Sequence, residues 1–204
     1  MLRSLAAITS DFIQKVKRVQ DAVAWTSPAF KGGRKTLTVH CLKDPADPQD
    51  PGYYYVERTG KDSVGFILWD DDQGLYGLLQ QWHGPLKRFQ IGSFTGSRDK
   101  DGLDALGTCL EEVTEEAGYH IDEPHRALHI GTYPVSANTN EEVDLFLIDV
   151  TGLSEQTIQP ENVFEANTKT VWLDLGEINS KAEWKAIVIM LEHQRSLEDS
   201  AVEF

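Results

Sequence analysis

The sequence predicts an α/β sandwich with a mixed β-sheet, preceded by an N-terminal helix and a short strand-containing lobe. Two observations favour this class. Apolar runs typical of strands lie both before and after one central segment with helical periodicity, and a second helical segment closes the chain. The 204 residues, of which 40% are hydrophobic, suffice to bury one good core with a small additional lobe.

The first elements form the expected N-terminal lobe, over residues 1–52. Residues 4–24 carry apolar side chains at helical spacing, which predicts an amphipathic helix. Residues 36–42 alternate like a strand, and the segment K-D-P-A-D-P-Q-D-P-G that follows predicts an irregular connection. We expect the lobe to end there and the main domain to cover residues 53–204.

The main domain alternates predicted strands with two helices. Six strands are expected, at residues 53–58, 63–69, 75–81, 128–133, 143–150 and 170–173. The residues from Asp70 to Gly74 predict a hairpin turn between the second and third of these strands. Residues 103–117 predict the central helix, which ends at Gly118, and residues 181–197 predict the closing helix.

Composition excludes several classes of partner. Acidic residues outnumber basic ones by 33 to 19, and the net charge of −14 repels nucleic acid and anionic membrane surfaces. We therefore expect neither nucleic acid nor membrane as a partner. A phosphate-bearing substrate has to arrive with cations or meet a local basic cluster. Cys41 and Cys109 have no zinc-type spacing, and no apolar run approaches the length of a spanning helix, so a cytoplasmic location is expected.

Chemistry-bearing residues are concentrated near the end of the central predicted helix, in the run E-E-V-T-E-E-A-G-Y that begins at Glu111. Glu112, Glu115 and Glu116 stand at i, i+3 and i+4, so their carboxylates share one helix face. Mg²⁺ prefers carboxylate oxygens and typically takes one or two, while substrate phosphates and water complete its shell. The alternative is an ordinary solvated acidic face, because like charges at this spacing cost only a few tenths of a kcal/mol.

This segment resembles the Nudix box, G-x5-E-x7-R-E-U-x-E-E-x-G-U, in which U is a bulky apolar residue. Six residues fall on its second half in register: Glu112, Val113, Glu115, Glu116, Gly118 and Tyr119. The first half departs from the pattern. Ser97 stands where the first Gly belongs, one residue after Gly96, while Leu103 replaces the first Glu and Glu111 replaces the Arg. The resemblance implies a Nudix sandwich with a Mg²⁺ site, in which Mn²⁺ is a possible substitute, and the metal ligands Glu112, Glu115, Glu116 and Gly96.

Flanking patterns over residues 55–191 resemble the ADP-ribose pyrophosphatase and nucleotide-sugar hydrolase branch of this family. The run L-L-Q-Q-W-H that ends at His83 is similar to its L-L-V-x-Q-Y-R strand end. Tyr133 and Glu141 keep the spacing of its Y-x-S-P-G-x-S-x-E loop, although V-S-A replaces S-P-G. By this resemblance Glu141 is the first candidate for the carboxylate that positions or deprotonates water, with its neighbour Glu142, and Glu115 is the competing base.

Three residues are candidates for binding the substrate. Arg58 suits a phosphate or a nucleobase, because a planar guanidinium serves either task, and an ion pair is its alternative role. Arg98 flanks the approach to the box and belongs to a possible local basic patch. Gln81 lies at the strand end that resembles the family branch.

The expected reaction is attack of water on a phosphorus atom of a nucleoside diphosphate joined to another group. ADP-ribose is the first expected substrate and a nucleotide sugar the second. The resemblance also implies a homodimer, since this branch usually pairs through its N-terminal part. The alternative is a non-catalytic Nudix-fold module that binds a nucleotide or a protein, motivated by Leu103 and Glu111 at box positions. The three retained carboxylates argue against it.

Overall fold

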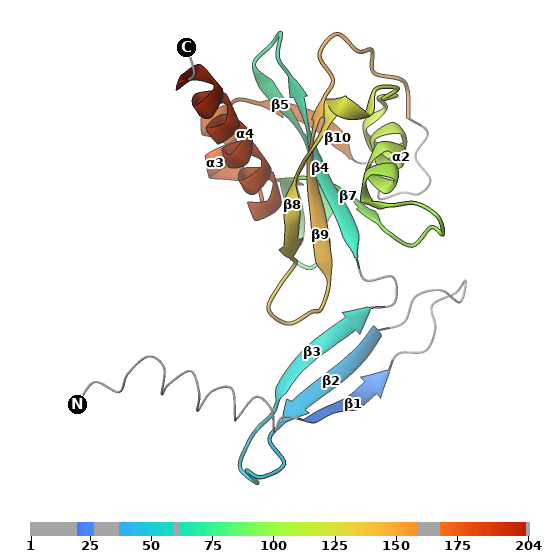
Figure 1. Cartoon of the computed structure of the whole chain (residues 1–204), viewed down its shortest axis with the longest axis vertical. Helices are drawn as coiled ribbons and strands as arrows, with labels where there is room; N and C mark the ends of the chain where they lie inside the picture. Colours follow the sequence, from blue (N-terminus) through green and yellow to red (C-terminus); the bar gives the residue numbers. More distant parts are fainter. Residues whose placement is uncertain (1–19, 27–36, 59–61, 159–167, 203–204) are drawn as a thin grey trace, which may run out of the picture. The chain divides into compact units, whose positions relative to one another are not determined.

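Backbone pairing groups the strands into two separate sheets, each in its own compact unit (Figure 1). The computed structural model describes residues 20–26, 37–58, 62–158 and 168–202. The first unit comprises residues 1–61 and 134–141, and the second comprises residues 62–133 and 142–204. Among the described residues, no helix is long and apolar enough to cross a membrane.

The first unit contains an antiparallel sheet of three strands in the order β1-β2-β3. Its strands are β1 (Gln20–Thr26), β2 (Leu37–Lys43) and β3 (Tyr53–Arg58). The two strands predicted here are confirmed. Because β3 pairs with β2 along its length, it belongs to this sheet, whereas the boundary drawn from the sequence after residue 52 separated the two strands.

The predicted N-terminal helix is wrong at its end. Residues 20–24 of that prediction lie in β1, where Gln20 pairs with Lys43 and Val23 with His40. The apolar residues of the run Q-D-A-V-A-W-T fit both the helical and the strand periodicity. This run forms a strand because β2 provides backbone hydrogen-bond partners for it. Residues 4–19 of the prediction lie outside the described residues.

The second unit contains a mixed sheet in the order β10-β5-β4-β9-β8, with β6 on β5 and β7 on β4. The strands are β4 (Ser63–Asp70), β5 (Leu75–His83), β6 (Arg88–Gly92), β7 (Phe94–Ser97), β8 (Ala127–Pro134), β9 (Glu142–Asp149) and β10 (Lys169–Leu173). The central strands β4 and β9 pair in parallel, whereas β4 pairs antiparallel with β5 and β7, and β5 pairs antiparallel with β6 and β10. The predicted hairpin turn between β4 and β5 is confirmed, with Gly74 in the left-handed region at a φ of 65°.

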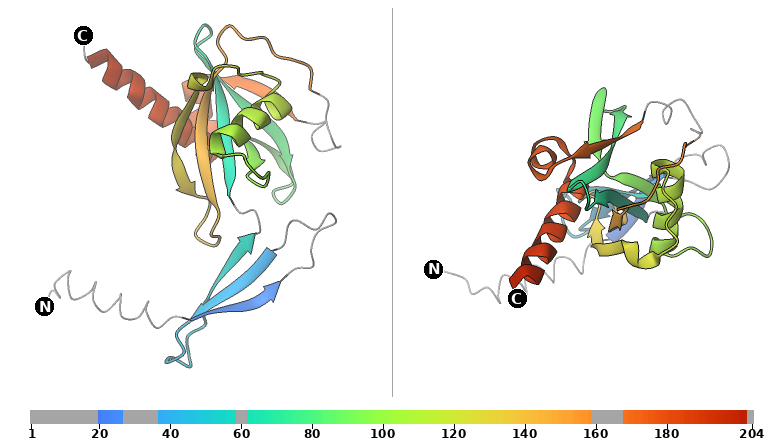
Figure 2. Two further views of the ribbon diagram at one scale, coloured as in Figure 1. Left: turned by 45° about the vertical axis from the view of Figure 1, so that its right-hand side comes forward. Right: turned by 90° about the horizontal axis from the view of Figure 1, so that it is seen from above.

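Helices cover both faces of this sheet. The helix α2 (Ala105–Ala117) lies on one face, while α3 (Leu175–Lys181) and α4 (Trp184–Val202) lie on the other (Figures 1 and 2). A single 3-10 turn, η1 (Pro124–Arg126), precedes β8. The central helix begins at Ala105, two residues later than predicted, because Asp104 caps it by accepting a hydrogen bond from the Gly107 N–H at 2.7 Å. The closing helix likewise begins at Trp184 rather than residue 181, since α3 occupies the preceding residues.

Successive side chains of the central strands point to opposite faces of the sheet, so one set packs against α2 and the other packs against α4. Even-numbered residues of β4 and β9, such as Val64 and Phe146, are buried against α2 together with Val113. On the other face, α4 is tied to the sheet by a hydrogen bond of 2.9 Å between the buried groups Tyr76 Oη and His193 Nδ1. The α2-facing side of β4, β7 and β9 is therefore the surface on which the box residues are positioned.

Candidate functional site

The carboxylate of Glu112, on helix α2, lies against the backbone of β7. A Cβ atom at Gly96 would overlap the carboxylate group of Glu112, so the absence of a side chain at residue 96 makes this contact possible. Gly96 is buried, and β7 holds it in place by pairing it with Val64 of the central strand β4. The structure thus brings together the two predicted metal residues Glu112 and Gly96.

Glu116 approaches the same strand one turn further along α2. Its Oε2 atom accepts a hydrogen bond of 3.4 Å from the backbone N–H of Thr95. Glu112 and Glu116 stand four residues apart, so both side chains leave the helix on the side that faces β7. Two of the three predicted carboxylates therefore converge on the backbone of residues 95 and 96.

The third predicted ligand, Glu115, is directed elsewhere. Its carboxylate lies 3.5 Å from the ammonium group of Lys100, which also contacts Glu111 at 2.7 Å. The hydrogen bond that Lys100 donates to the Glu111 carboxylate raises the pKa of Lys100. Glu111 stands where the box that this segment resembles has an arginine. Lys100 supplies a cation between Glu111 and Glu115, which lie side by side.

The carboxyl group of Glu112 has a raised pKa. Burial beside β7 raises its pKa from 4.5 to about 7, and the neighbouring charge of Glu115 adds to this effect. The negative charge of Glu112 therefore has little compensation from the groups around it. A carboxylate in this position gains from a cation placed beside it.

The carboxylates are not preassembled into a complete metal centre. Within the described part of the chain, no group of three or more His, Cys, Asp or Glu side chains is arranged to hold a metal ion. Glu112 and Glu116 converge, whereas Glu115 turns toward Lys100. Two carboxylates and a backbone carbonyl match the partial protein shell that Mg²⁺ usually accepts.

Arg98 lies beyond the end of β7 and reaches across the sheet. Its backbone N–H donates to the carbonyl of Asp62 at 3.0 Å, and its Nη1 donates to Asp144 Oδ2 at 3.0 Å. Asp144 is only 7% exposed and sits on β9, where it also meets side chains from β8. The predicted substrate residue Arg98 is thus fixed on the α2 side of the sheet.

The remaining predicted residues fall in other places. In the first unit, Arg58 forms an ion pair of 3.0 Å with Glu141, the kind of contact considered as its alternative role. Glu142 is exposed at the first position of β9, in the second unit. Gln81 is exposed on β5 opposite Gln90 of β6, and no described contact joins it to α2.

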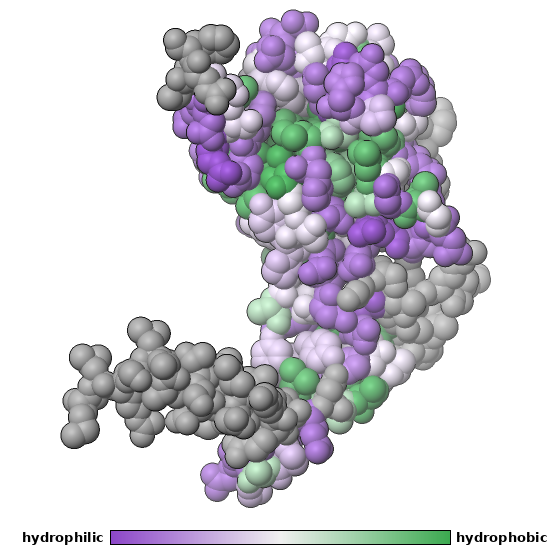
Figure 3. Space-filling view, viewed as in Figure 1, coloured by the Kyte–Doolittle hydropathy of each residue, from purple (hydrophilic) through white to green (hydrophobic). Residues whose placement is uncertain are grey.

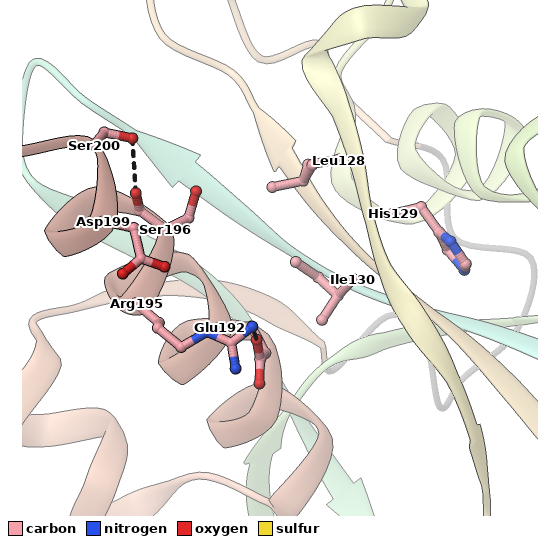
Figure 4. A pocket seen from close by; sticks show the side chains of 8 residues that line it. All are labelled: Leu128, His129, Ile130, Glu192, Arg195, Ser196, Asp199 and Ser200. Carbon is pink, nitrogen blue, oxygen red and sulfur yellow. Dashed lines mark hydrogen bonds and ion pairs between the residues drawn. The ribbon is translucent and has the colours of Figure 1, made fainter. Parts of the chain in front are cut away.

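The other face of the sheet carries a cavity of about 380 Å³ between β8 and α4 (Figure 4). Leu128 and Ile130 point into it from β8, and Glu192 and Arg195 of α4 form an ion pair of 3.1 Å on its wall. Apolar side chains reach the surface of the second unit beside α4 (Figure 3), and Leu128 is 47% exposed. This cavity contains none of the predicted site residues, so its size does not identify it as the predicted site.

Two residues at the candidate site were missed from the sequence. Asp144 interrupts the otherwise continuous apolar run of β9, and a charged residue inside such a run is a signal for a buried polar contact. Lys100 lies in a loop eleven residues before Glu111, and only the fold brings the two together. Nothing in the spacing of the sequence indicated that contact.

A solved structure described as that of an ADP compounds hydrolase shares this fold. It aligns with a TM-score of 0.64 and 10% sequence identity, and the alignment covers 89% of this chain and 96% of that chain. No family model and no curated protein sequence matches the chain. At this identity the likeness shows the fold, and it confirms the α/β sandwich with a mixed sheet.

Proposed function

We propose that the protein is a metal-dependent hydrolase that cleaves the diphosphate linkage of a nucleoside diphosphate derivative by attack of water on phosphorus. The observation that carries this proposal is the convergence of Glu112 and Glu116 on the backbone of β7 at Gly96. The fold shared with an ADP compounds hydrolase and the retained second half of the box support the same function.

Glu112, Glu116 and the backbone of Gly96 are the groups we propose to hold Mg²⁺, with Glu115 joining after its side chain turns away from Lys100. The close approach of the Glu112 carboxylate to Gly96 and the raised pKa of Glu112 fit this role, because together they leave a carboxylate beside the strand with little compensating charge. When bound, the metal would neutralise phosphate charge and lower the pKa of the attacking water, and Mn²⁺ is the expected substitute.

Further residues of the chain are proposed to bind the substrate and move the proton. Arg98, fixed on the α2 side of the sheet, offers a guanidinium for the diphosphate. Glu141, Glu142 and Glu115 are the candidates for the base that orients or deprotonates water. Arg58 and Gln81 are proposed to contact the remainder of the substrate.

ADP-ribose is the first proposed substrate and a nucleotide sugar the second, both from the resemblance to that branch of hydrolases. The proposed products are a nucleoside monophosphate and a phosphorylated remainder. The same resemblance supports a homodimer formed through the N-terminal part. Sedimentation velocity tests this point, with an expected mass of two 22.9-kDa chains.

The central experiment measures nucleoside monophosphate release from ADP-ribose and a panel of nucleotide sugars, with Mg²⁺, Mn²⁺ or EDTA. We expect metal-dependent turnover that falls on the order of 100-fold in Glu112→Gln and in Glu116→Gln, since each removes charge stabilisation at the reacting phosphate. Glu192→Gln is the matched control, because Glu192 lies on α4 on the other face of the sheet. Its turnover should equal that of the native protein.

Absence of turnover in every condition would instead favour a non-catalytic module that binds a nucleotide or a protein. One observation motivates this second candidate. Lys100 already pairs with Glu115 and Glu111, so part of the acidic face has a cation of its own. Calorimetric titration with ADP-ribose then separates a nucleotide-binding module from a protein-binding one.

A further inference from the structure

Asp144 is a buried charge that the proposed chemistry does not use directly. It is 7% exposed, although aspartate is almost never fully buried unless it is paired. On either side of it along β9, Val143 and Leu145 are completely buried. A carboxylate at this position therefore requires partners that compensate for its desolvation.

Those partners divide between the two carboxylate oxygens. From β8, the Thr132 hydroxyl donates to Oδ1 at 2.6 Å, and His129 Nε2 lies 3.1 Å from the same atom. From the end of β7, the Arg98 guanidinium donates to Oδ2 at 3.0 Å. One oxygen is thus anchored by β8, which leaves the other to hold Arg98.

The strand register places this pair close to the carboxylates of α2. Val64 on β4 pairs with Gly96 on one side and with Asp144 on the other, so the three residues form one row across the sheet. Neighbouring strands are about 4.8 Å apart, which puts Asp144 roughly 10 Å from the backbone on which Glu112 lies.

Both groups also lie on the same face of the sheet. Phe146 and Ile148, which share the parity of Asp144 along β9, belong to the core packed against α2. Figure 4 shows His129 on the opposite side of β8 from Leu128 and Ile130, which face α4. Asp144 and its partners therefore lie on the α2 side, together with Glu112.

We infer that Asp144 is a positioning residue that holds the Arg98 guanidinium beside the carboxylates of α2, ready to receive the diphosphate of the substrate. This inference rests on the proposed function. The ion pair engages Nη1, whereas a guanidinium carries five N–H donors, so further donors remain for phosphate oxygens. Fixing the long side chain before binding removes much of the entropy cost that a mobile arginine would incur on meeting the substrate.

The test compares the affinity for ADP-ribose in Mg²⁺, measured by calorimetry, among the native protein, Asp144→Asn, Arg98→Ala and the double variant. We expect each single change to weaken binding about tenfold, and the double variant to bind no more weakly than Arg98→Ala, because the two residues act as one unit. The matched control is Asp149→Asn. It breaks a contact of 3.5 Å between Asp149 and Arg126 at the far end of the same strand and should change the affinity less than about twofold.

Two further readouts separate positioning from a merely structural role. In Asp144→Asn, KM should rise about tenfold while kcat stays within about threefold, as expected when ground-state and transition-state binding are lost equally. Thr132→Val removes one anchor of Asp144 and keeps the charge, so it should weaken binding in the same direction by a smaller factor. This second variant keeps the inference testable if Asp144→Asn folds poorly.

Each outcome decides the inference. Native-like affinity in Asp144→Asn beside weak binding in Arg98→Ala overturns the positioning role and leaves the proposed function standing. Additive losses in the double variant also overturn it, since independent residues do not act through one another. If the native protein neither binds nor cleaves ADP-ribose or any nucleotide sugar, the proposed function fails first and this inference fails with it.

Discussion

The hydrogen atom that serves as the side chain of Gly96 leaves room for the Glu112 carboxylate beside β7. We predict that Gly96→Ala displaces Glu112 and lowers metal-dependent turnover by about tenfold or more, since small misplacements of a reacting constellation are costly. Overpacking at this contact should also lower the free energy of unfolding by about 1–3 kcal/mol. Steady-state kinetics and urea denaturation measure the two effects.

Gly84→Ala is the control for this substitution, because no heavy atom lies within 4 Å of a Cβ at residue 84. It should leave both turnover and unfolding unchanged. Equal turnover in Gly96→Ala and the native protein would contradict a role for the missing side chain at residue 96.

The raised pKa of Glu112 predicts a pH-dependent stability. Burial raises this pKa from 4.5 to about 7, so the folded protein binds the proton more tightly than the unfolded chain does. The folded state is therefore penalised increasingly as the pH rises from about 4.5 through about 7. Urea denaturation in EDTA at about pH 5 and about pH 8 should show the native protein losing stability relative to Glu112→Gln. Parallel pH profiles for the two proteins would disprove the shift.

The sequence predicted which residues belong to the candidate site better than it predicted which side chains they contact. Helical spacing placed Glu112 and Glu116 on one face, and resemblance to the box suggested Gly96, which the structure brings together with Glu112. The deflection of Glu115 toward Lys100 and the anchoring of Arg98 by Asp144 depend on pairing between distant segments. Spacing along one chain does not encode such contacts.

The helix α2 is defined at both ends by single residues. Asp104 caps its first turn, and Gly118 ends it at a φ of 73°, where a Cβ would lie 2.5 Å from the carbonyl oxygen of Gln156. We predict that Asp104→Ala lowers the free energy of unfolding by about 1 kcal/mol, measured by urea denaturation. The exposed Asp101, just before the cap, provides the control Asp101→Ala, which should have no measurable effect. Equal losses in both variants would show that the effect comes from surface charge rather than from the cap.

The strands and helices that are bounded by clear turn or capping residues were predicted well. The strands β4 and β5 are joined by D-D-D-Q-G, and this turn fixes their register. The short strands β6 and β7 were missed because R-F-Q-I-G and F-T-G-S have too few apolar residues for a pattern. The helix α3 was missed for the same reason, since only Ile178 of its seven residues is buried.

The net charge of the whole molecule predicts how salt affects substrate binding. With a net charge of −14, the protein repels an anionic diphosphate over a distance set by the ionic strength. In EDTA, raising NaCl from about 50 to about 300 mM should therefore strengthen ADP-ribose binding, and Mg²⁺ should reduce this dependence. Calorimetric titrations at the two concentrations measure it. Binding that weakens with salt would show instead that local basic groups such as Arg98 dominate the field.

The parallel pairing of β4 with β9 also sets the order in which the chain can acquire its structure. Ser63 pairs with Val143, so the central strand has to wait for most of the intervening sequence before it meets its neighbour. During synthesis the ribosome will have released β4, β5 and α2 while one edge of β4 is still unpaired. Contacts of such long sequence separation close slowly, and the exposed apolar edge favours association with other chains until they form. We therefore expect a nascent chain stalled before residue 142 to aggregate more readily than one that includes residues 142–149, which pair β9 with β4.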